Sequence, residues 1–548
     1  MNSQHRYAIA VSFAAYLFVA GPVWAQEAAA PPHGFPQDWS DRSIAFSLDA
    51  LAQHPDLIEK EPRIRRQIMQ RFRAPEPTAL LGTAIGAETL GEVVHHRDWN
   101  LALGRGHVAA NMYPGKYTFN PAATPSCSSD FVVFGLDIAG ATGGQANLVA
   151  LNNLYAGTGG ICTTGPTVYF AYNITTGTGG KIVTSPIISE DGTKIAFVES
   201  LGSSSVFHVL TFTAGQGGIT TAAAPTGMVS LTYSTTDTTT TSSPWIDYGG
   251  DIVYVSDDGG VLHKVTGVFK GTPTLVTTAP WPITVSAGTR LSPPVLDQFS
   301  GVLFVGGRNG DLYEVNATSG IISALEVGLH GGTNAGIFAP PIVDGSNGVA
   351  YVVSADGNNG SGTSAILQEI STTTLTALAT APIGLGASGG DTTETIYQPA
   401  LSNAYYTSPS SGAIYTCGTG TADTTPWEYS FGFNGLLMKT APSASEQLLT
   451  STAARCTSWS EFFNPNIGGA GGTDFFFFGL TQDCTGTGTS GCVAERTTAT
   501  QTLTTVDIAG GPSGIIVDNY STAGQASSIY FTGEKTNTAY KFTQNGLQ

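Results

Sequence analysis

The residues of this sequence that could carry chemistry are few, and its histidines are the clearest of them. Three histidines, His208, His263 and His330, fall in the part of the chain whose pattern predicts strands. His208 and His263 stand inside strand-like runs, where a hydrogen-bonded structural histidine is the ordinary interpretation. His330 stands in a glycine-rich stretch, and loops of that kind place side chains at the surface. His330 is therefore the candidate ligand-binding residue.

A second candidate is the run of oxygen-bearing residues from Ser354 to Gly360. Within it, Asp356 and Asn358 offer the carboxylate and amide oxygens that calcium prefers, so these two are the candidate metal ligands. The run lacks the distal glutamate of an EF-hand, and a plain turn is the competing interpretation. No motif requires a cofactor, and calcium is the one ion for which the pattern supplies ligands.

Short catalytic motifs are absent from the sequence. It contains no G-x-S-x-G elbow, no HExxH pair and no P-loop. Acidic pairs such as Glu190-Asp191 and Asp257-Asp258 stand in expected turns, where aspartate is favoured because it bonds to the backbone. A catalytic site would have to be assembled from loops that are distant in sequence, which leaves the question of enzyme activity open.

The charge of the chain is low and unevenly distributed. Charged residues make up 11% of the 548 residues, and the formal net charge is -18. Residues 1–116 hold 11 basic and 11 acidic side chains, whereas residues 117–548 hold 11 basic and 29 acidic ones. Because an acidic body repels phosphate backbones, we expect no nucleic-acid partner.

The N-terminus has the pattern of a signal peptide over residues 1–25. A polar start with His5 and Arg6 precedes the apolar run Ala8–Ala20, and Val23-Trp24-Ala25 supplies the small residues of a cleavage site. Cleavage after Ala25 would leave a mature chain that begins at Gln26, and the alternative is an uncleaved anchor. No later apolar stretch reaches eighteen residues, so we expect no integral membrane segment after cleavage. The predicted location is secreted: extracellular, cell-surface or periplasmic.

Six cysteines fit an oxidising compartment and predict disulfides. Six cysteines allow fifteen pairings, and the sequence alone does not choose between them. Proximity along the chain favours Cys127–Cys162, Cys417–Cys456 and Cys484–Cys492.

A repeated pattern begins near residue 117. A small or polar residue, a proline and an apolar stretch recur at intervals of 43 to 70 residues, and each copy is followed by a strand-turn-strand pattern. In the clearest copy, Val302–Val305 and Leu312–Val315 flank an Asn-Gly turn, a strong hairpin signal. Another copy predicts strands at Ala404–Tyr406 and Ala413–Tyr415.

These repeats predict an all-β fold, a β-propeller of four-stranded blades over residues 117–548. The first strand of each hairpin is apolar on both faces, and a ring of blades covers every such face. Residues 128–182 have strands but no proline anchor, so they either complete the last blade or form one of their own. We favour seven blades, with eight as the alternative. Ring closure requires the C-terminal strand Ala539–Phe542 to pair inside a blade, with Ile529–Phe531 or with a strand near Phe131–Phe134.

Two single blades also resemble known families. Ser189–Val198 resembles the Asp-Gly hairpin repeat of TolB-like propellers, and Gly301–Gly320 is similar to the repeat of quinoprotein-like propellers. The resemblance implies a blade geometry and no particular activity. Quinoprotein alcohol dehydrogenases usually carry a pair of adjacent cysteines beside the cofactor; this sequence has no such pair, so the resemblance implies no quinone.

Before the repeats, residues 26–36 form an expected linker and residues 37–116 an expected charged helical segment. Ile44, Leu48 and Leu51 recur at helical spacing, and a second helical pattern follows Pro62. The second pattern carries five arginines between Arg63 and Arg73. We expect it to dock on the acidic propeller, and a membrane surface is the alternative.

Two functions are consistent with these features. The favoured one is a secreted, non-catalytic binding or surface-assembly protein whose extracellular ligand or surface partner is unknown. It depends on the low charge, the Thr/Gly-rich loops and the missing catalytic motifs. The alternative is an extracellular propeller enzyme, a hydrolase or lyase acting on a polysaccharide or a lactone-like substrate.

Overall fold

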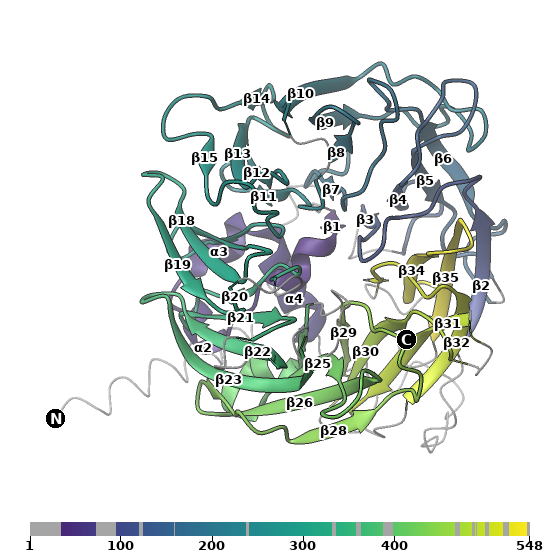
Figure 1. Ribbon diagram of the computed structural model, residues 1–548. Helices are drawn as coiled ribbons and strands as arrows, with labels where there is room; N and C mark the ends of the chain where they lie inside the picture. Colours follow the sequence, from purple (N-terminus) through teal and green to yellow (C-terminus); the bar gives the residue numbers. More distant parts are fainter. Residues whose placement is uncertain are drawn as a thin grey trace.

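Eight antiparallel sheets of four or five strands stand as blades around a common axis in the computed structural model (Figure 1). The structure describes residues 34–72, 95–119, 124–157, 159–236, 240–330, 336–357, 363–386, 398–465, 472–484, 488, 490–498, 503–518 and 525–544. The β-propeller prediction is confirmed. The blade count is eight, the alternative of the two that the sequence left open, and the favoured count of seven is wrong.

The first four blades extend from residue 35 to residue 326. Blade 1 holds β1 (Phe35–Gln37), β3 (Gly115–Thr118), β4 (Phe131–Gly135), β5 (Leu148–Asn152) and β6 (Thr167–Tyr172). Blade 2 holds β7 (Ile187–Ile188), β8 (Lys194–Ser200), β9 (Ser205–Thr211) and β10 (Met228–Ser234). Blade 3 holds β11 (Trp245–Asp247), β12 (Ile252–Ser256), β13 (Val261–Thr266), β14 (Thr274–Leu275) and β15 (Ile283–Thr284). Blade 4 holds β16 (Val295–Asp297), β17 (Val302–Gly306), β18 (Asp311–Asn316) and β19 (Ile322–Glu326).

The other four blades complete the ring. Blade 5 holds β20 (Ile342–Asp344), β21 (Val349–Ser354), β22 (Ser364–Ser371) and β23 (Thr376–Leu385). Blade 6 holds β24 (Ala400–Leu401), β25 (Ala413–Thr419), β26 (Pro426–Asn434), β27 (Leu437–Met438) and β28 (Ala444–Gln447). Blade 7 holds β29 (Ser460–Asn464), β30 (Thr473–Leu480), β31 (Ser490–Thr497) and β32 (Leu503–Ala509). Blade 8 holds β33 (Ile516–Asp518), β34 (Ser528–Gly533), β35 (Thr538–Gln544) and, from the N-terminal region, β2 (His95–Ala102).

Residues 128–182 account for the difference in blade number, because their strands form a blade of their own, blade 1, and do not complete the last blade. The first of these strands, β4, pairs with β3, and Tyr117 lies opposite Phe131. The sequence pattern missed β3 because it lacks the repeated anchor motif and crosses the expected boundary between the helical segment and the propeller at residue 116. Another local difference is α5 (Asn403–Thr407), a short helix where the repeat pattern predicted a strand at Ala404–Tyr406.

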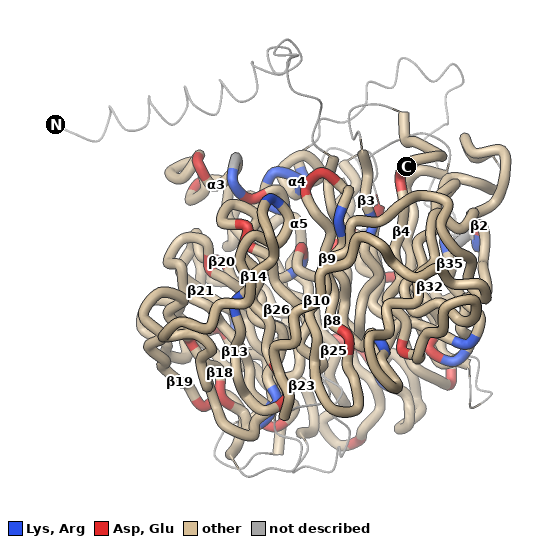
Figure 2. The backbone as a smooth tube through the Cα atoms, turned by 90° about the horizontal axis from the view of Figure 1, so that it is seen from above, with Lys and Arg blue, Asp and Glu red and all other residues tan. Residues whose placement is uncertain are grey.

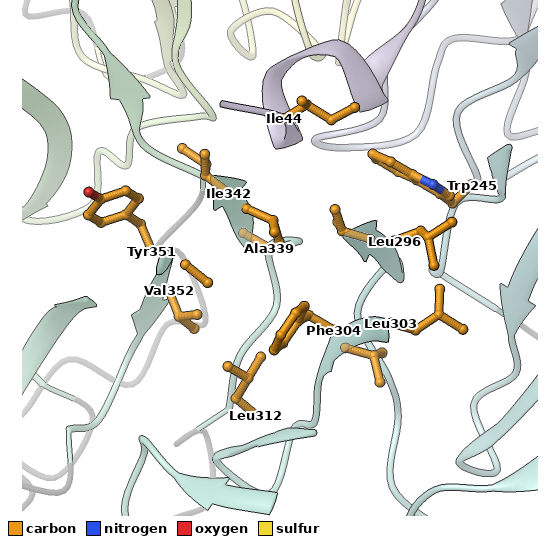
Figure 3. Close-up of a cluster of buried hydrophobic side chains, with 14 of the residues drawn as sticks. Ile44, Trp245, Leu296, Leu303, Phe304, Leu312, Ala339, Ile342, Tyr351 and Val352 are labelled. Atoms are coloured by element: carbon orange, nitrogen blue, oxygen red, sulfur yellow. The ribbon is translucent and has the colours of Figure 1, made fainter. Parts of the chain in front are cut away.

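The blades are held together by strands that are apolar on both faces. All eight residues of β30 are buried, because a blade lies against each of its faces. Figure 3 shows one such contact, in which Phe304 and Leu312 of blade 4 and Val352 of blade 5 share a buried cluster with Ile44 from the N-terminal segment. This continuous interblade packing is what a closed ring provides.

Ring closure takes place in blade 8, where strands from both ends of the chain meet. β35 pairs with its hairpin partner β34 on one side and with β2 on the other. The expectation that the C-terminal strand pairs inside a blade is confirmed, but its N-terminal neighbour is β2 and not the strand near Phe131. The pairing of β2 shifts register at Asp98. The Asp98 carboxylate lies 3.0 Å from the Lys541 ammonium, and both side chains are buried.

A second buried ion pair joins blade 8 to blade 1. Lys116 Nζ lies 2.6 Å from Asp518 Oδ2, and the two side chains are 0% and 2% exposed. Lys116 belongs to β3, which lies between β1 and β4 in blade 1, and Asp518 belongs to β33, the innermost strand of blade 8. The closure is therefore fixed by two buried ion pairs in addition to strand pairing.

Residues 38–72, which we call the cap, cover one end of the ring. They contain η1 (Trp39–Ser43), α2 (Leu48–Leu51), α3 (Pro55–Lys60) and α4 (Pro62–Arg71). In Figure 1 α4 lies near the axis of the ring, and Figure 2 shows charged residues gathered on α3 and α4 at one end of the molecule. Arg71 pairs with Glu461 of blade 7 at 2.7 Å, and Arg65 with Glu190 of blade 2 at 3.0 Å. The prediction that the arginine-rich helix docks on the propeller is confirmed; Arg73 lies outside the described residues.

Three disulfides are formed, and their pairing is the one that chain proximity favoured. Cys127–Cys162 lies within blade 1, Cys417–Cys456 joins β25 of blade 6 to the connection before blade 7, and Cys484–Cys492 closes a turn of blade 7. Among the described residues, no helix is long and apolar enough to cross a membrane.

Candidate functional site

The two ends of the ring differ because the cap covers only one of them. The cap contacts the turns between the first and second strands of several blades: Arg65 binds Glu190, Gln298 donates to Glu61, and Ser346 accepts from the backbone of Ser47. In an antiparallel blade, the turn between the second and third strands and the connection to the next blade lie at the other end. We call that end the uncapped face. Among the described residues, its turns between second and third strands have no hydrogen bond to the cap, whereas three connections between blades reach the cap at Pro244, Gln398 and Trp459.

His330, the candidate ligand-binding residue, lies on the uncapped face. It stands in the connection from β19 to β20, between blades 4 and 5, and its side chain is 54% exposed. Its Nε2 lies 2.7 Å from Asp311 Oδ1 at the start of β18. Its backbone N–H donates to Glu326 Oε1 over 3.3 Å. The imidazole is thus held in place by a carboxylate while part of its ring faces solvent.

Asp311 is itself fixed by two neighbours from the same blade. Tyr313 Oη donates to Asp311 Oδ2 over 3.0 Å, and Asn309 Nδ2 donates to the same oxygen over 2.8 Å. The turn before Asp311 needs Gly310, whose φ of 97° is left-handed and whose added Cβ would lie 2.6 Å from the Gly328 carbonyl oxygen. The Asn-Gly turn therefore positions the carboxylate that positions His330.

The electrostatics of this group favour a charged imidazole. The hydrogen bond that His330 donates to Asp311, with Asp311 and Glu326 as nearby negative charges, raises the pKa of His330 above its ordinary value. Burial raises the pKa of Tyr313, so its hydroxyl stays protonated and remains a donor to Asp311. An imidazole that is partly exposed and held on a rigid base can bind an acidic or hydrogen-bond-accepting group when it is protonated.

The structure brings the second candidate, Asp356, beside the first. Leu329 N donates to the Asp356 carbonyl oxygen over 2.9 Å, and Gly328 bridges to Gly357. The Asp356 residue itself is fully buried, and Asn358 lies outside the described residues. In the described ranges, no three histidine, cysteine, aspartate or glutamate side chains form a group that could hold a metal ion. The calcium interpretation stays a prediction.

The other two histidines of the β region are buried between strands. His263 Nε2 lies 3.1 Å from Asp257 Oδ2, beside the ring of Tyr233. His208 belongs to a series of three side chains across blade 2: its Nε2 lies 3.0 Å from Glu199 Oε2 and its Nδ1 lies 2.9 Å from Ser230 Oγ. Glu199 and His208 are fully buried, whereas Ser230 lies on the exposed outer strand β10.

The sequence pointed to His330 but not to the residues that hold it. Asp311, Tyr313 and Asn309 were noticed only as parts of a hairpin, since a turn explains Asn-Gly-Asp without any site. The signal that could have found them is their spacing. Asp311 and Tyr313 alternate along one strand and therefore face the same side of the sheet, next to the end where the connection to blade 5 begins.

Comparisons with known proteins bear on the fold alone. No protein-family model matches the chain, and no curated protein matches it. Among solved structures, Sqt1 from Saccharomyces cerevisiae is 11% identical, covers 82% of this chain and 99% of its own, and has a TM-score of 0.50. The Dos1 propeller is 10% identical over 82% and 95% with a TM-score of 0.49. BamB from Moraxella catarrhalis is 13% identical over 82% and 100% with a TM-score of 0.45.

At such identities the likeness to Sqt1 supports the β-propeller fold and no residue-level function. The finer resemblance of single blades to TolB-like and quinoprotein-like repeats stays a prediction.

Proposed function

We propose that this chain is an exported β-propeller that binds a partner or ligand through its uncapped face without catalysing a reaction. The observation that carries the proposal is the difference between the two ends of the ring. The cap occupies one end through ion pairs and hydrogen bonds to six blades, from Glu190 in blade 2 to Glu461 in blade 7. At the other end, the described turns between second and third strands have no hydrogen bond to the cap, and we expect these turns and the His330 loop to receive an external partner.

The residues of the uncapped face support binding. His330 combines an exposed ring with a rigid base, and rigid presentation lowers the entropic cost of association. The backbone on which it stands is fixed as well, because Gly328 bridges to Gly357 of the next blade. Binding sites in propellers and other rigid scaffolds are commonly made from such loops.

Export is supported by the disulfides together with the sequence of residues 1–25. Three structural disulfides are typical of proteins in an oxidising compartment and rare in cytosolic proteins. N-terminal sequencing of the protein recovered outside the cytoplasm should give Gln26 as the first residue. Recovery of intact Met1 from a cytoplasmic fraction would contradict export.

Site-specific photocrosslinking tests the binding surface. A photoreactive amino acid at position 363, an exposed residue in the turn between β21 and β22, reports on the uncapped face. The same amino acid at position 69, an exposed residue of the cap, serves as the matched control. In cells that make the protein, we expect discrete crosslinked products from position 363 and none from position 69. His330→Ala should reduce their yield, because it removes the positioned imidazole. Products from position 69 alone would refute the uncapped face as the binding surface.

A second candidate function, hydrolysis, is favoured by one observation. Ser230, His208 and Glu199 hydrogen-bond in the order hydroxyl, imidazole, carboxylate, as in serine hydrolases. Here the hydroxyl contacts Nδ1 and the carboxylate Nε2, the reverse of the usual use of the two ring nitrogens. The series also has a structural use, because Glu199 Oε1 accepts from the backbone N–H of Thr176 in the connection between blades 1 and 2.

Labelling with a fluorophosphonate decides between the two candidates. The reagent reacts with a serine whose oxygen is activated by a base, and labelling at Ser230 that is lost in His208→Gln would establish the hydrolase. Under the binding proposal we expect Ser230 to remain unlabelled while the protein is fully folded.

A further inference from the structure

A cavity of about 80 Å³ lies at the capped end of the ring, between the cap and blades 6, 7 and 8. Apolar side chains of the blades form part of its lining, including Leu401, Phe462 and Ile516. Polar side chains also line it, among them Gln37 of β1, Arg42 of the cap and Glu461 of blade 7. The cavity is separate from the uncapped face, so a ligand bound in it would be distinct from the partner of the proposed function.

Most charges around the cavity are paired. Arg66 lies 2.7 Å from Asp41, and Arg71 lies 2.7 Å from Glu461. Asp38 Oδ1 accepts from Ser40 N over 2.9 Å and from Ser40 Oγ over 2.5 Å. These groups therefore hold the cap to itself and to blade 7, and their hydrogen bonds stay within the protein.

Among the arginines that line the cavity, Arg42 differs because it forms no ion pair with a described carboxylate. Its Nη atoms donate to neutral oxygens, those of the Trp459 backbone, Ser460, Tyr113 and Gln398. Within the described residues, no carboxylate lies within ion-pair distance of it, and its buried Nε has no hydrogen-bond partner. A guanidinium is bidentate by nature, and a buried donor without an acceptor is costly.

Gln37 lines the same cavity, and its side-chain amide makes no hydrogen bond. Its side chain is 1% exposed, and neither Nε2 nor Oε1 has a hydrogen-bond partner. A glutamine amide offers donors on one atom and an acceptor on the other. Together with Arg42 Nε, the lining thus presents donors suited to a carboxylate and one acceptor suited to a hydroxyl group.

We propose that this cavity binds a small monocarboxylate through Arg42 and Gln37, with preference for one that carries a hydroxyl beside the carboxylate. A volume of 80 Å³ on this measure holds about five water-sized groups, which is the size of glycolate or acetate. The carboxylate accepts from Arg42 Nε and Gln37 Nε2, the hydroxyl donates to Gln37 Oε1, and the carbon atoms contact the apolar part of the lining.

Titration of the full mature protein with sodium glycolate, sodium acetate and neutral acetamide tests the proposal, with ionic strength held constant by NaCl. Melting temperature and calorimetric binding are the readouts. We expect saturable binding of both carboxylates, tighter for glycolate, and none for acetamide. Gln37→Leu should weaken glycolate binding about a hundredfold, the equivalent of the two hydrogen bonds that it removes, each of which corresponds to about a tenfold change.

The stability of Gln37→Leu in NaCl alone should not fall, because the Gln37 side chain has no hydrogen bond to lose. Gln447→Leu, on the outer strand β28 of blade 6, is the matched control and should bind glycolate like the unaltered protein. Arg42→Lys keeps the positive charge without Nε and should also weaken binding. Absence of saturable binding, equal binding of acetamide, or unchanged affinity in Gln37→Leu would each overturn the proposal.

Discussion

The ion pair between Asp98 and Lys541 should be the most sensitive point of ring closure, and Asp98→Asn tests it. The Asp98 carboxylate accepts from Lys541 Nζ over 3.0 Å and from Thr543 Oγ1 over 2.5 Å, at the point where β2 shifts register on β35. The Lys541 and Asp98 side chains are 0% and 2% exposed. Asparagine keeps the size of the side chain but leaves the buried ammonium without its counter-ion.

The magnitude follows from the pKa of Lys541, which burial lowers from 10.5 to about 8. At about 1.4 kcal/mol per pKa unit, keeping this ammonium charged in the fold already costs about 3.5 kcal/mol. Without Asp98 the charged form becomes less favourable still, but the lysine can release its proton, which at pH 7 costs about 5 kcal/mol. The lysine therefore lowers the free energy of unfolding of the variant by no more than the difference between these two costs, about 1.5 kcal/mol. The lost hydrogen bond from Thr543 lowers it by about 1.5 kcal/mol more.

The pH dependence of this loss distinguishes a buried ion pair from a packing defect. Because the folded pKa of Lys541 is depressed, the unfolded chain binds the proton more tightly, and stability from this group rises with pH between about 8 and 10.5. Above about pH 9 the lysine is neutral in both folded proteins, so its share of the difference disappears. The variant should lose about 3 kcal/mol at pH 7, or about 3 °C in melting temperature for a chain of this length, and about half of that at pH 9.

Calorimetry of the unaltered protein, Asp98→Asn and Asp98→Asn/Lys541→Met at pH 7 and pH 9 measures these differences. The double variant should recover part of the loss, since it removes the uncompensated charge. Asp56→Asn is the matched control, because Asp56 forms an exposed ion pair with Lys60 at 3.1 Å and should change nothing measurable. A loss in Asp98→Asn that is equal at both pH values, or no larger than in the control, would refute the reasoning.

Burial raises the pKa of Asp41 and of Glu369 to about 7 each, so their contribution to stability is complete below pH 4 and is lost as pH rises through 7. Thermal melts should therefore show a higher melting temperature at pH 5 than at pH 8, and a slope that stays unchanged in Glu369→Gln would count against this assignment. Cys417→Ser/Cys456→Ser removes a covalent link between blades 6 and 7 and should cost about 2–4 kcal/mol, seen as an earlier denaturant midpoint than in the unaltered protein. The arginines of α4 are already paired with the propeller, so flotation with anionic vesicles should show no salt-sensitive binding, and its detection would restore the membrane interpretation. If Asp356 and Asn358 hold calcium, CaCl₂ should raise the melting temperature, and Asp356→Asn should abolish that rise while MgCl₂ has no effect.

The sequence alone identified only part of the candidate site. His330 could be singled out because a histidine in a glycine-rich loop is unusual in this chain, and its place on the uncapped face agrees with that reasoning. Its partner Asp311 stands nineteen residues earlier on another strand, and its proximity depends on how blade 4 meets blade 5. Gln37 and Arg42 gave no signal at all, because nothing local marks a glutamine or an arginine as lacking a partner.

The sequence by itself determined the class of fold, the hairpins and the favoured disulfide pairing, because these depend on residues close together in the chain. Alternating and fully apolar runs, Asn-Gly turns and proline anchors act within one blade. Only the tertiary structure decided the number of blades, the pairing of β2 with β35 and the place of the cap. These depend on contacts between residues hundreds of positions apart, such as Asp98 with Lys541, and on the area that a closed ring buries. No local pattern in β2 indicates which strand it pairs with, since a short strand with polar and apolar residues can complete any sheet that lacks an edge strand.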